Sequence, residues 1–150
     1  MANIVPYSFP VELLSGTHQF QNGGNTFKLA LYTANPYTTA STVYVITSEV
    51  SSAGGSQYTA TGNTLASQAV SNVNNVATVD FADTVWGTPT PASFAAAYGA
   101  IYNTTSGNKL VVILDFGGTK TCSNGTFTVT FPNPTSGTPS GSDAILSITS

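Results

Sequence analysis

One continuous apolar run stands out in the sequence: Lys109-Leu110-Val111-Val112-Ile113-Leu114-Asp115-Phe116. Five consecutive aliphatic residues are typical of a strand covered on both faces, and the run is far shorter than the roughly 20 residues that cross a bilayer. If it were exposed, it would promote aggregation, because little charge lies nearby. The run therefore predicts a buried strand in the centre of a sheet.

The residues before this run predict its hairpin partner. Residues 103–108 are rich in Asn, Thr, Ser and Gly and form the expected loop. Before them, residues 96–102 contain enough alanine for a helix, but Tyr98, Ala100 and Tyr102 alternate along the segment. That period of two, next to a suitable partner strand, favours a strand.

Alternation of apolar and polar residues marks three further strands. In residues 26–33 the apolar side chains share one face, and residues 126–131 alternate without interruption. Between them, residues 76–81 follow a tight hairpin turn at 72–75. The side chains expected to point inward are Phe27, Leu29, Leu31, Ala77, Val79 and Phe81, and those expected to point outward are Thr78 and Asp80.

Other segments fit more than one structure or give short patterns. Residues 43–46 fit either a strand or a single helical turn, and short strands are expected through Tyr58 and through residues 65–70. A Pro-Gly-Ser loop at residues 132–142 leads into a closing strand at 144–148.

One short helix is expected near the N-terminus, over residues 9–15. Ser8 can cap its first turn, Glu12 lies within it, and Gly16 stands just past its end. Pro10 is compatible with this helix because it falls in the first turn.

The whole chain, residues 1–150, is expected to form one all-β domain. Fourteen Gly and eight Pro divide it into short segments, and neither an internal repeat nor a domain boundary is visible. Two prolines within residues 88–91 mark a hinge in the middle. Short alternating strands predict a single-domain β-sandwich with a short N-terminal helix, and leave jelly-roll and immunoglobulin-like connections open.

The composition excludes several classes of function. The chain has 150 residues, with three Lys, no Arg, six acidic residues, one His and a formal net charge of −3. Charged residues make up 6% of the chain, whereas about 25% is usual, and the polar character comes instead from 24 Thr and 17 Ser. Three lysines cannot neutralise a nucleic-acid backbone or hold an anionic membrane surface, so neither partner is expected.

The single cysteine, Cys122, allows neither an intrachain disulfide nor a thiolate metal site. The first residues, Met1-Ala2-Asn3-Ile4-Val5-Pro6, lack the basic and apolar regions of a secretory signal. These features predict synthesis in a cytoplasm, although the composition is typical of a protein that works outside one.

Candidate catalytic residues are few. His18 is the only imidazole, and the sequence marks no orienting partner for it, so we interpret it as a solvated or singly bonded loop histidine. Asp80, Asp83 and Asp115 could imitate the carboxylates of a glycosidase or a calcium site, but they lack the spacing of a calcium loop and fall on a strand face or at strand ends. The sequence therefore predicts no catalytic residue, no metal site and no cofactor.

Aromatic residues give the strongest sign of a binding surface. Trp86, Tyr98 and Tyr102 could form a platform for sugar stacking or a protein interface. Further members of such a platform would be Tyr32, Tyr37 and Tyr58. The alternative is that these rings pack in the core or across strands, which we favour for Trp86.

Six stretches occur in a characteristic order: Phe27-Lys28-Leu29-Ala30-Leu31-Tyr32-Thr33, Glu49-Val50, Phe81-Ala82-Asp83-Thr84-Val85-Trp86, Ala97-Tyr98-Gly99-Ala100-Ile101-Tyr102-Asn103-Thr104-Thr105, Asp115-Phe116-Gly117 and Asn124-Gly125-Thr126-Phe127-Thr128-Val129. Together, over about residues 9–131, the chain resembles a group of small all-β virion proteins encoded by tailed bacteriophages. The motifs are patterns of strands and turns, and none is a catalytic signature. This chain differs from the group in having no arginine just before Tyr98 and in its longer Pro-Gly-Ser segment at 132–142.

The resemblance implies a non-enzymatic component of the phage particle, located in the virion and released by lysis. Our leading hypothesis is a capsid decoration (cement) protein, which contacts the major capsid protein and stabilises the assembled head. Such parts are usually symmetric, so a homo-oligomer is expected, and a trimer would match the three-fold positions of a capsid. The alternative is a tail, baseplate or fibre-associated β module that binds host glycans through its aromatic residues.

Overall fold

The computed structural model describes residues 3–73, 75–132 and 145–149. It is 44% strand, its sheets are antiparallel, and it has one short helix, which confirms the all-β fold class. The elements are α1 (Ser8–Leu14), β1 (Phe27–Tyr32), β2 (Asn63–Thr64), β3 (Ala69–Val73), β4 (Val76–Asp80), β5 (Thr84–Trp86), β6 (Ala92–Asn103), β7 (Lys109–Gly125), β8 (Phe127–Val129) and β9 (Leu146–Thr149).

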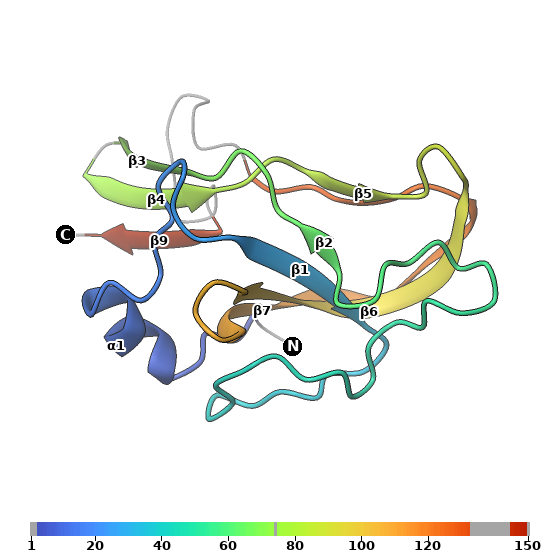
Figure 1. The fold of residues 1–150 in the computed structure, drawn as a ribbon, viewed down its shortest axis with the longest axis horizontal. Helices are drawn as coiled ribbons and strands as arrows, with labels where there is room; N and C mark the ends of the chain where they lie inside the picture. Colours follow the sequence, from blue (N-terminus) through green and yellow to red (C-terminus); the bar gives the residue numbers. More distant parts are fainter. Residues whose placement is uncertain (1–2, 74, 133–144, 150) are drawn as a thin grey trace.

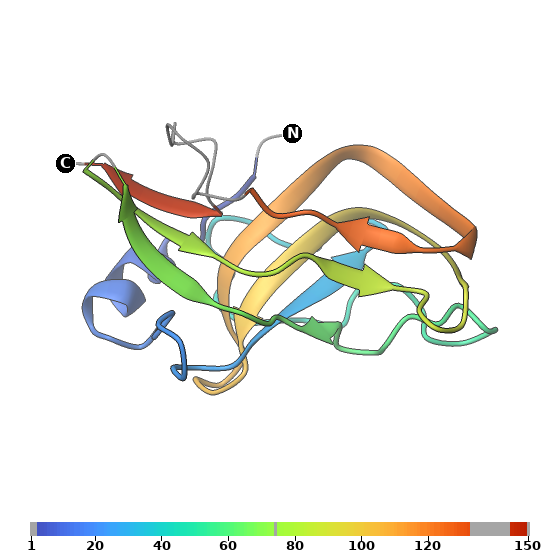
Figure 2. The same ribbon diagram turned by 90° about the horizontal axis from the view of Figure 1, so that it is seen from above.

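The strands form two layers that face each other (Figures 1 and 2). One layer is a four-stranded sheet in the order β2-β1-β6-β7. The other consists of a three-stranded sheet, β3-β4-β9, and a two-stranded sheet, β5-β8. Helix α1 lies at the end of the molecule that carries β3, β4 and β9 (Figure 1).

In the second layer, β3 lies at one edge, and β4 and β5 follow one another in the chain. β4 runs on into β5, and β8 and β9 pair with them antiparallel, Val129 opposite Thr84 and Leu146 opposite Val79. Four residues, 80–83, separate the paired positions of β4 and β5, and sixteen, 130–145, separate those of β8 and β9. β9 confirms the closing strand, while most of the predicted loop at 132–142 and the expected strand start at Ala144 lie outside the described residues.

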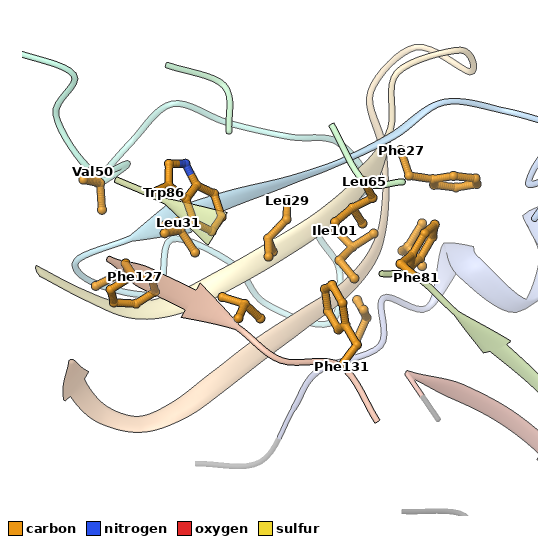
Figure 3. Close-up of a cluster of buried hydrophobic side chains, with 14 of the residues drawn as sticks. Phe27, Leu29, Leu31, Val50, Leu65, Phe81, Trp86, Ile101, Phe127 and Phe131 are labelled. Atoms are coloured by element: carbon orange, nitrogen blue, oxygen red, sulfur yellow. The ribbon is translucent and has the colours of Figure 1, made fainter. Parts of the chain in front are cut away.

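The main core fills the space between the layers (Figure 3). β1 contributes Phe27, Leu29 and Leu31 to it, as the alternation predicted, and all three are fully buried. The ring of Phe27 stacks on that of Phe20 with centroids 4.6 Å apart, and Phe81 packs against both rings. The alternation in β8 has the same result, because Phe127, Val129 and Phe131 all enter this core.

A second core covers the other face of the four-stranded sheet. It contains Ala30, Tyr32, Ala100, Tyr102, Leu110 and Ile113 from the strands, with Tyr37 from the segment that follows β1. Ile4, Tyr44 and Val45 pack against this cluster from outside the sheet. β1 and the parts of β6 and β7 next to their connecting loop are therefore buried on both faces, as the apolar run in β7 predicted. Thr64 of β2 and residues 117–121 of β7 are exposed.

The prediction that this run lies in the centre of its sheet is wrong. β7 is an edge strand, hydrogen-bonded to β6 on one side. Its other edge is covered by segments that are not strands. Ile4 exchanges two backbone hydrogen bonds with Ile113, of 2.9 and 2.8 Å, and the N–H of Leu110 donates to the Thr42 carbonyl at 3.0 Å. β7 can therefore be buried although it is an edge strand, because segments outside the strands hydrogen-bond to its outer edge.

The β6–β7 hairpin confirms the strand interpretation of residues 96–102. The two strands pair from Ala92 opposite Gly125 to Asn103 opposite Lys109, with three irregularities in register. The largest lies where Ala96 pairs with Lys120 but Tyr98 pairs with Asp115, so β7 carries extra residues there. Such a bulge bends a strand, which fits the curved course of β7 in Figure 2.

Helix α1 begins one residue earlier than predicted, at Ser8. Ser8 is the first helical residue rather than the cap; Tyr7 occupies the cap position, and no side chain caps the helix. Pro10 falls in the first turn and Gly16, with φ of +74°, lies just past the end, as predicted. The Ser8 hydroxyl is buried without a hydrogen-bond partner among the described residues, so it makes no capping bond.

Several of the shorter predicted strands differ from the structure. Within residues 43–46, Val43 makes a single bridge to Lys109, and the chain then turns, with the Glu49 N–H bonded to the Ile46 carbonyl at 3.0 Å. Each of the two alternatives for this segment therefore describes only part of it. No strand passes through Tyr58, and the strand expected at 65–70 is replaced by the short β2 and by β3.

β3 and β4 pair as a hairpin from Ala69 opposite Asp80 to Val73 opposite Val76, so Asn72 belongs to β3 and not to the turn, and Asn74 lies outside the described residues. Two side chains in β4 also differ from expectation. Phe81 is buried and Val79 packs against the main core, whereas Ala77 is exposed and Thr78 is buried. Ala77 lies on the predicted face, at a place where that face extends past the core. Thr78 can be buried because its hydroxyl is hydrogen-bonded to that of Ser71 at 2.8 Å.

Gly62 provides a test of how closely the chain that leads into β2 approaches β1. It has φ of +79°, and a Cβ there would overlap the backbone carbonyl of Leu29. We expect Gly62→Ala to destabilise the fold by more than about 4 kcal/mol, measured by chemical denaturation, because neither backbone can move without breaking the sheet.

Gly107→Ala is the matched control. Gly107 has φ of +71°, but nothing lies within 4 Å of the added Cβ, so only the left-handed backbone conformation is penalised. A cost of about 1–2 kcal/mol is expected there. Equal losses in the two variants would contradict the close approach of Gly62 to β1.

Candidate functional site

His18 is buried, which corrects its interpretation as a solvated or singly bonded loop residue. Its Nε2 lies 3.0 Å from Oε2 of Glu12, and its Nδ1 lies 3.1 Å from Nδ2 of Asn103. Lys109 extends the cluster, with its Nζ donating to Oε1 of Glu12 at 2.6 Å. We refer to Glu12, His18, Asn103 and Lys109 as the histidine cluster.

The hydrogen bonds of Asn103 determine which nitrogen of the His18 imidazole carries the proton. The Asn103 Oδ1 accepts a hydrogen bond from the Ser106 N–H, and its Nδ2 also contacts the Thr17 carbonyl, so the NH₂ group faces His18. An NH₂ group can only donate, and Nδ1 must therefore accept. The proton then sits on Nε2, where it is donated to Glu12, and the imidazole is neutral.

The electrostatics agree with a neutral ring beside an ionised carboxylate. Burial lowers the pKa of His18 below its usual value, more than its hydrogen bond to Glu12 raises it. Burial also acts to raise the pKa of Glu12, but the hydrogen bonds from Lys109 and His18, with the positive charge of Lys109, hold that pKa below its usual range.

This arrangement positions structural elements and does not present a catalytic base. A base needs a free ring nitrogen within reach of a substrate, and both nitrogens of His18 are engaged. Glu12 belongs to α1, and Asn103 and Lys109 face each other next to the loop that joins β6 to β7. The cluster therefore fastens the helix and the segment after it onto that hairpin.

A second polar cluster surrounds Glu49. Its Oε1 accepts hydrogen bonds from the Tyr58 hydroxyl and the Thr61 N–H, both at 2.7 Å, and its Oε2 accepts one from Tyr44. Burial raises the pKa of Tyr58, so its hydroxyl stays a donor. The Tyr102 hydroxyl donates to the Thr61 carbonyl at 2.6 Å, and this cluster thus fastens the chain between β1 and β2 to the sheet.

Trp86, Tyr98 and Tyr102 do not form a shared exposed platform. Trp86 is 2% exposed in the main core, and Tyr102 is 1% exposed in the second core, on the other face of the sheet. Tyr98 is half-buried against that second core. The core alternative for Trp86 is the one that the structure shows (Figure 3). Its ring is stacked on that of Tyr58, with the centroids 6.1 Å apart.

Of the three candidate aspartates, Asp83 and Asp115 accept hydrogen bonds from backbone N–H groups. Asp83 accepts a hydrogen bond from the Phe131 N–H at 2.9 Å, and Asp115 accepts one from the Gly117 N–H at 2.9 Å. Burial raises the pKa of Asp80, with the Asp83 charge acting in the same direction. In residues 3–73, 75–132 and 145–149, no group of three metal-ligating side chains occurs.

A cleft of about 790 Å³ lies beside the bent part of β7 and along β8. Phe116, Phe127 and Val129 are among its apolar lining residues, and Lys120 and Cys122 also line it. Cys122 is buried, and its thiol donates to the Ala92 carbonyl at 3.3 Å. The thiol thus has a partner within the fold.

The exposed face of α1 is apolar. Tyr7, Val11 and Leu14 are 74%, 69% and 90% exposed, and their spacing of four and three residues places them on one face of the helix. Phe9 and Glu12 are buried on the opposite face. We call Tyr7, Val11 and Leu14 the α1 ridge.

An apolar cleft of about 270 Å³ opens between α1 and the sheet β3-β4-β9. The helix side supplies Phe9 and Leu13, and the sheet side supplies Val70, Val79 and Ile148. The other lining residues are His18, Phe20, Gln21, Ala77, Thr78 and Leu146. Val70 and Ile148 are exposed, so the inner face of this sheet is open to solvent here. We call this the α1 cleft.

The ridge and the cleft, not the predicted aromatic residues, are the candidate contact surface of the molecule. The sequence signal for the ridge was present, since apolar residues at 7, 11 and 14 repeat with helical period. Among the described helical residues, no helix is long and apolar enough to cross a membrane.

The histidine cluster predicts that stability falls with acidification. The folded-state pKa of His18 is lowered, so the unfolded chain takes up the proton first, and stability is lost as the pH drops from about 6.5 toward the folded-state pKa. Glu12, whose pKa is also lowered, adds a second loss below about 4.5. Chemical denaturation at a series of pH values measures both.

His18→Gln is the control for this pH dependence, because an amide can replace one hydrogen bond but does not titrate. We expect its stability to be lower at pH 7 and nearly constant down to pH 5. An unchanged slope between pH 7 and pH 5 in this variant would assign the pH dependence to other groups.

Trp86 is expected to report on stability and not on ligand binding. Trp86→Ala should cost about 3–5 kcal/mol in thermal or chemical denaturation, because it empties a site in the main core. Trp86→Phe should cost much less, since Nε1 of Trp86 has no hydrogen-bond partner among the described residues. A Trp86→Ala chain as stable as the parent would show that the ring lies outside the core.

No family model, no curated protein and no solved structure matches this chain. Evidence about its function therefore comes from its own residues.

Proposed function

We propose that this chain is a non-enzymatic structural protein of a tailed-phage particle, and that it decorates and stabilises the head. The stretches that carry the resemblance to small virion proteins include β1, β5, β8 and the last seven residues of β6. Each of these strands contributes side chains to the main core. The similarity thus lies in the framework, which supports a structural role for the family pattern.

The observation that carries the proposal is the uncharged, partly apolar contact surface at the α1 end. Three side chains of the α1 ridge are largely exposed, and the α1 cleft beside them is lined by apolar residues. Exposed apolar groups that gather in one place mark protein contact sites. A shell protein needs such contacts, and low charge limits repulsion between copies crowded on a lattice.

The second candidate is a module of the tail, baseplate or fibre, and immunogold labelling distinguishes this location from the head. Glycan binding through Trp86 and Tyr102 has less support, because both rings are buried. Immunogold labelling of native particles with an antibody against this chain locates it directly. Gold on the heads supports decoration, gold on the tail supports the second candidate, and unlabelled particles contradict a virion role.

Decoration of the head predicts a gain in shell stability. Adding the purified chain to heads that lack it should raise the temperature at which the heads release their DNA, because added contacts between capsid subunits must break first. Release is followed by the fluorescence of a DNA-binding dye during heating.

The control is an unrelated acidic protein of similar size at the same concentration, which should leave the release temperature unchanged. If heads release their DNA at the same temperature with and without a saturating concentration of the chain, the cement role is contradicted.

A further inference from the structure

We propose that the α1 ridge of one copy of this chain inserts into the α1 cleft of another copy, and that this contact builds the homo-oligomer. The inference rests on the proposed function only in supposing that the chain works as a repeated part. It adds the surface and the residues through which the copies meet.

The two surfaces lie on opposite sides of the same helix. Residues 7, 11 and 14 point away from the molecule, whereas Phe9 and Leu13 face the cleft. A ridge therefore cannot fill the cleft of its own chain. Filling it requires a second molecule, and the contact joins two different surfaces.

The cleft has the size and chemistry to receive the ridge. An apolar cavity of about 150 Å³ holds one benzene, so about 270 Å³ admits two aliphatic side chains. The ridge offers Val11 and Leu14, with Leu14 the most exposed. Aliphatic side chains in a pocket lined by Val70, Val79 and Ile148 would bury apolar surface on both partners.

The charges favour a second copy over a charged partner. The residues lining the cleft include no Lys, Asp or Glu, and the one charged residue of α1, Glu12, is turned inward onto Lys109 and His18. A charged partner would find no opposite charge here, whereas another copy presents an equally uncharged ridge. Both halves of the contact are present on every chain, so no other partner is needed.

A contact between two different surfaces has a consequence for symmetry. Each copy uses its ridge toward one neighbour and its cleft toward the next, which closes into a ring when the rotation permits. A trimer satisfies this rule, and so does any other closed ring. In contrast, a contact of ridge against ridge would give only two-fold dimers.

Light scattering coupled to size-exclusion chromatography tests the association on the full-length purified chain. We expect the parent to elute above the monomer mass of 15.4 kDa over a range of concentrations, and the double variant Val11→Ser with Leu14→Ser to shift to that mass. Ile46→Ser, an equally exposed apolar position outside both surfaces, should keep the oligomer. Circular dichroism verifies that each variant is folded.

Cross-linking then tests which surfaces meet. Leu14→Cys and Ile148→Cys are prepared separately, mixed, and treated with a short bismaleimide. We expect linked dimers in the mixture and few in either variant alone, and none in the parent, whose thiol at Cys122 is buried. The positions chosen are exposed, so neither variant threatens the core.

Three outcomes would overturn the inference: a parent that is monomeric at every concentration, a double variant that associates like the parent, or Leu14→Cys chains that link to one another as readily as the mixture does. The proposed function is judged separately by immunogold labelling. A chain that oligomerises but does not label particles would refute the virion role alone. A monomer that labels heads would refute the ridge-and-cleft contact alone.

Discussion

β1 and the neighbouring parts of β6 and β7 are covered on both faces, and the rest of the structure depends on this burial. β1 directs Phe27, Leu29 and Leu31 into the main core and Ala30 and Tyr32 into the second core. Any backbone group of a doubly covered sheet must find a partner, since water cannot reach it. The segments that cover the second face therefore have to be fixed in place, including those that hydrogen-bond to the outer edge of β7.

Polar groups do this fixing, although the chain has few charges. Glu49 gathers Tyr44, Tyr58 and the Thr61 N–H on one side, and Glu12 gathers His18 and Lys109 on the other. The buried Glu12 and the half-buried Glu49 each accept at least two hydrogen bonds, which offsets the cost of removing a carboxylate from water. Two of the six acidic residues thus hold loops and the helix onto the sheet and are not available for surface chemistry.

The same constraint explains where the proposed contact surface, the α1 ridge and the α1 cleft, lies. The second layer extends past the first at the end that carries β3, β4 and β9, and α1 only partly covers the overhang (Figure 1). The inner face of that sheet stays apolar because it continues the main core. An open apolar cleft next to an exposed apolar helix face is unusual for a protein that stays monomeric, and it directs attention to assembly.

The sequence by itself determined the all-β class, the β6–β7 hairpin, the strand positions of β1, β4 and β8, and the short helix. These follow from local periodicity and turn residues, which act over a few neighbouring positions. The sequence also contains the pattern of the α1 ridge, because Tyr7, Val11 and Leu14 are apolar residues at helical spacing.

Only the tertiary structure decided the edge position of β7, the burial of Trp86, Tyr102 and His18, and the α1 cleft. Each depends on which distant segment covers a given face. His18 meets Asn103, 85 residues away in the chain, and Glu12 meets Lys109, 97 residues away. No local pattern encodes such contacts. Burial of a ring or an imidazole is a property of its neighbours in space, and the sequence shows only its neighbours in the chain.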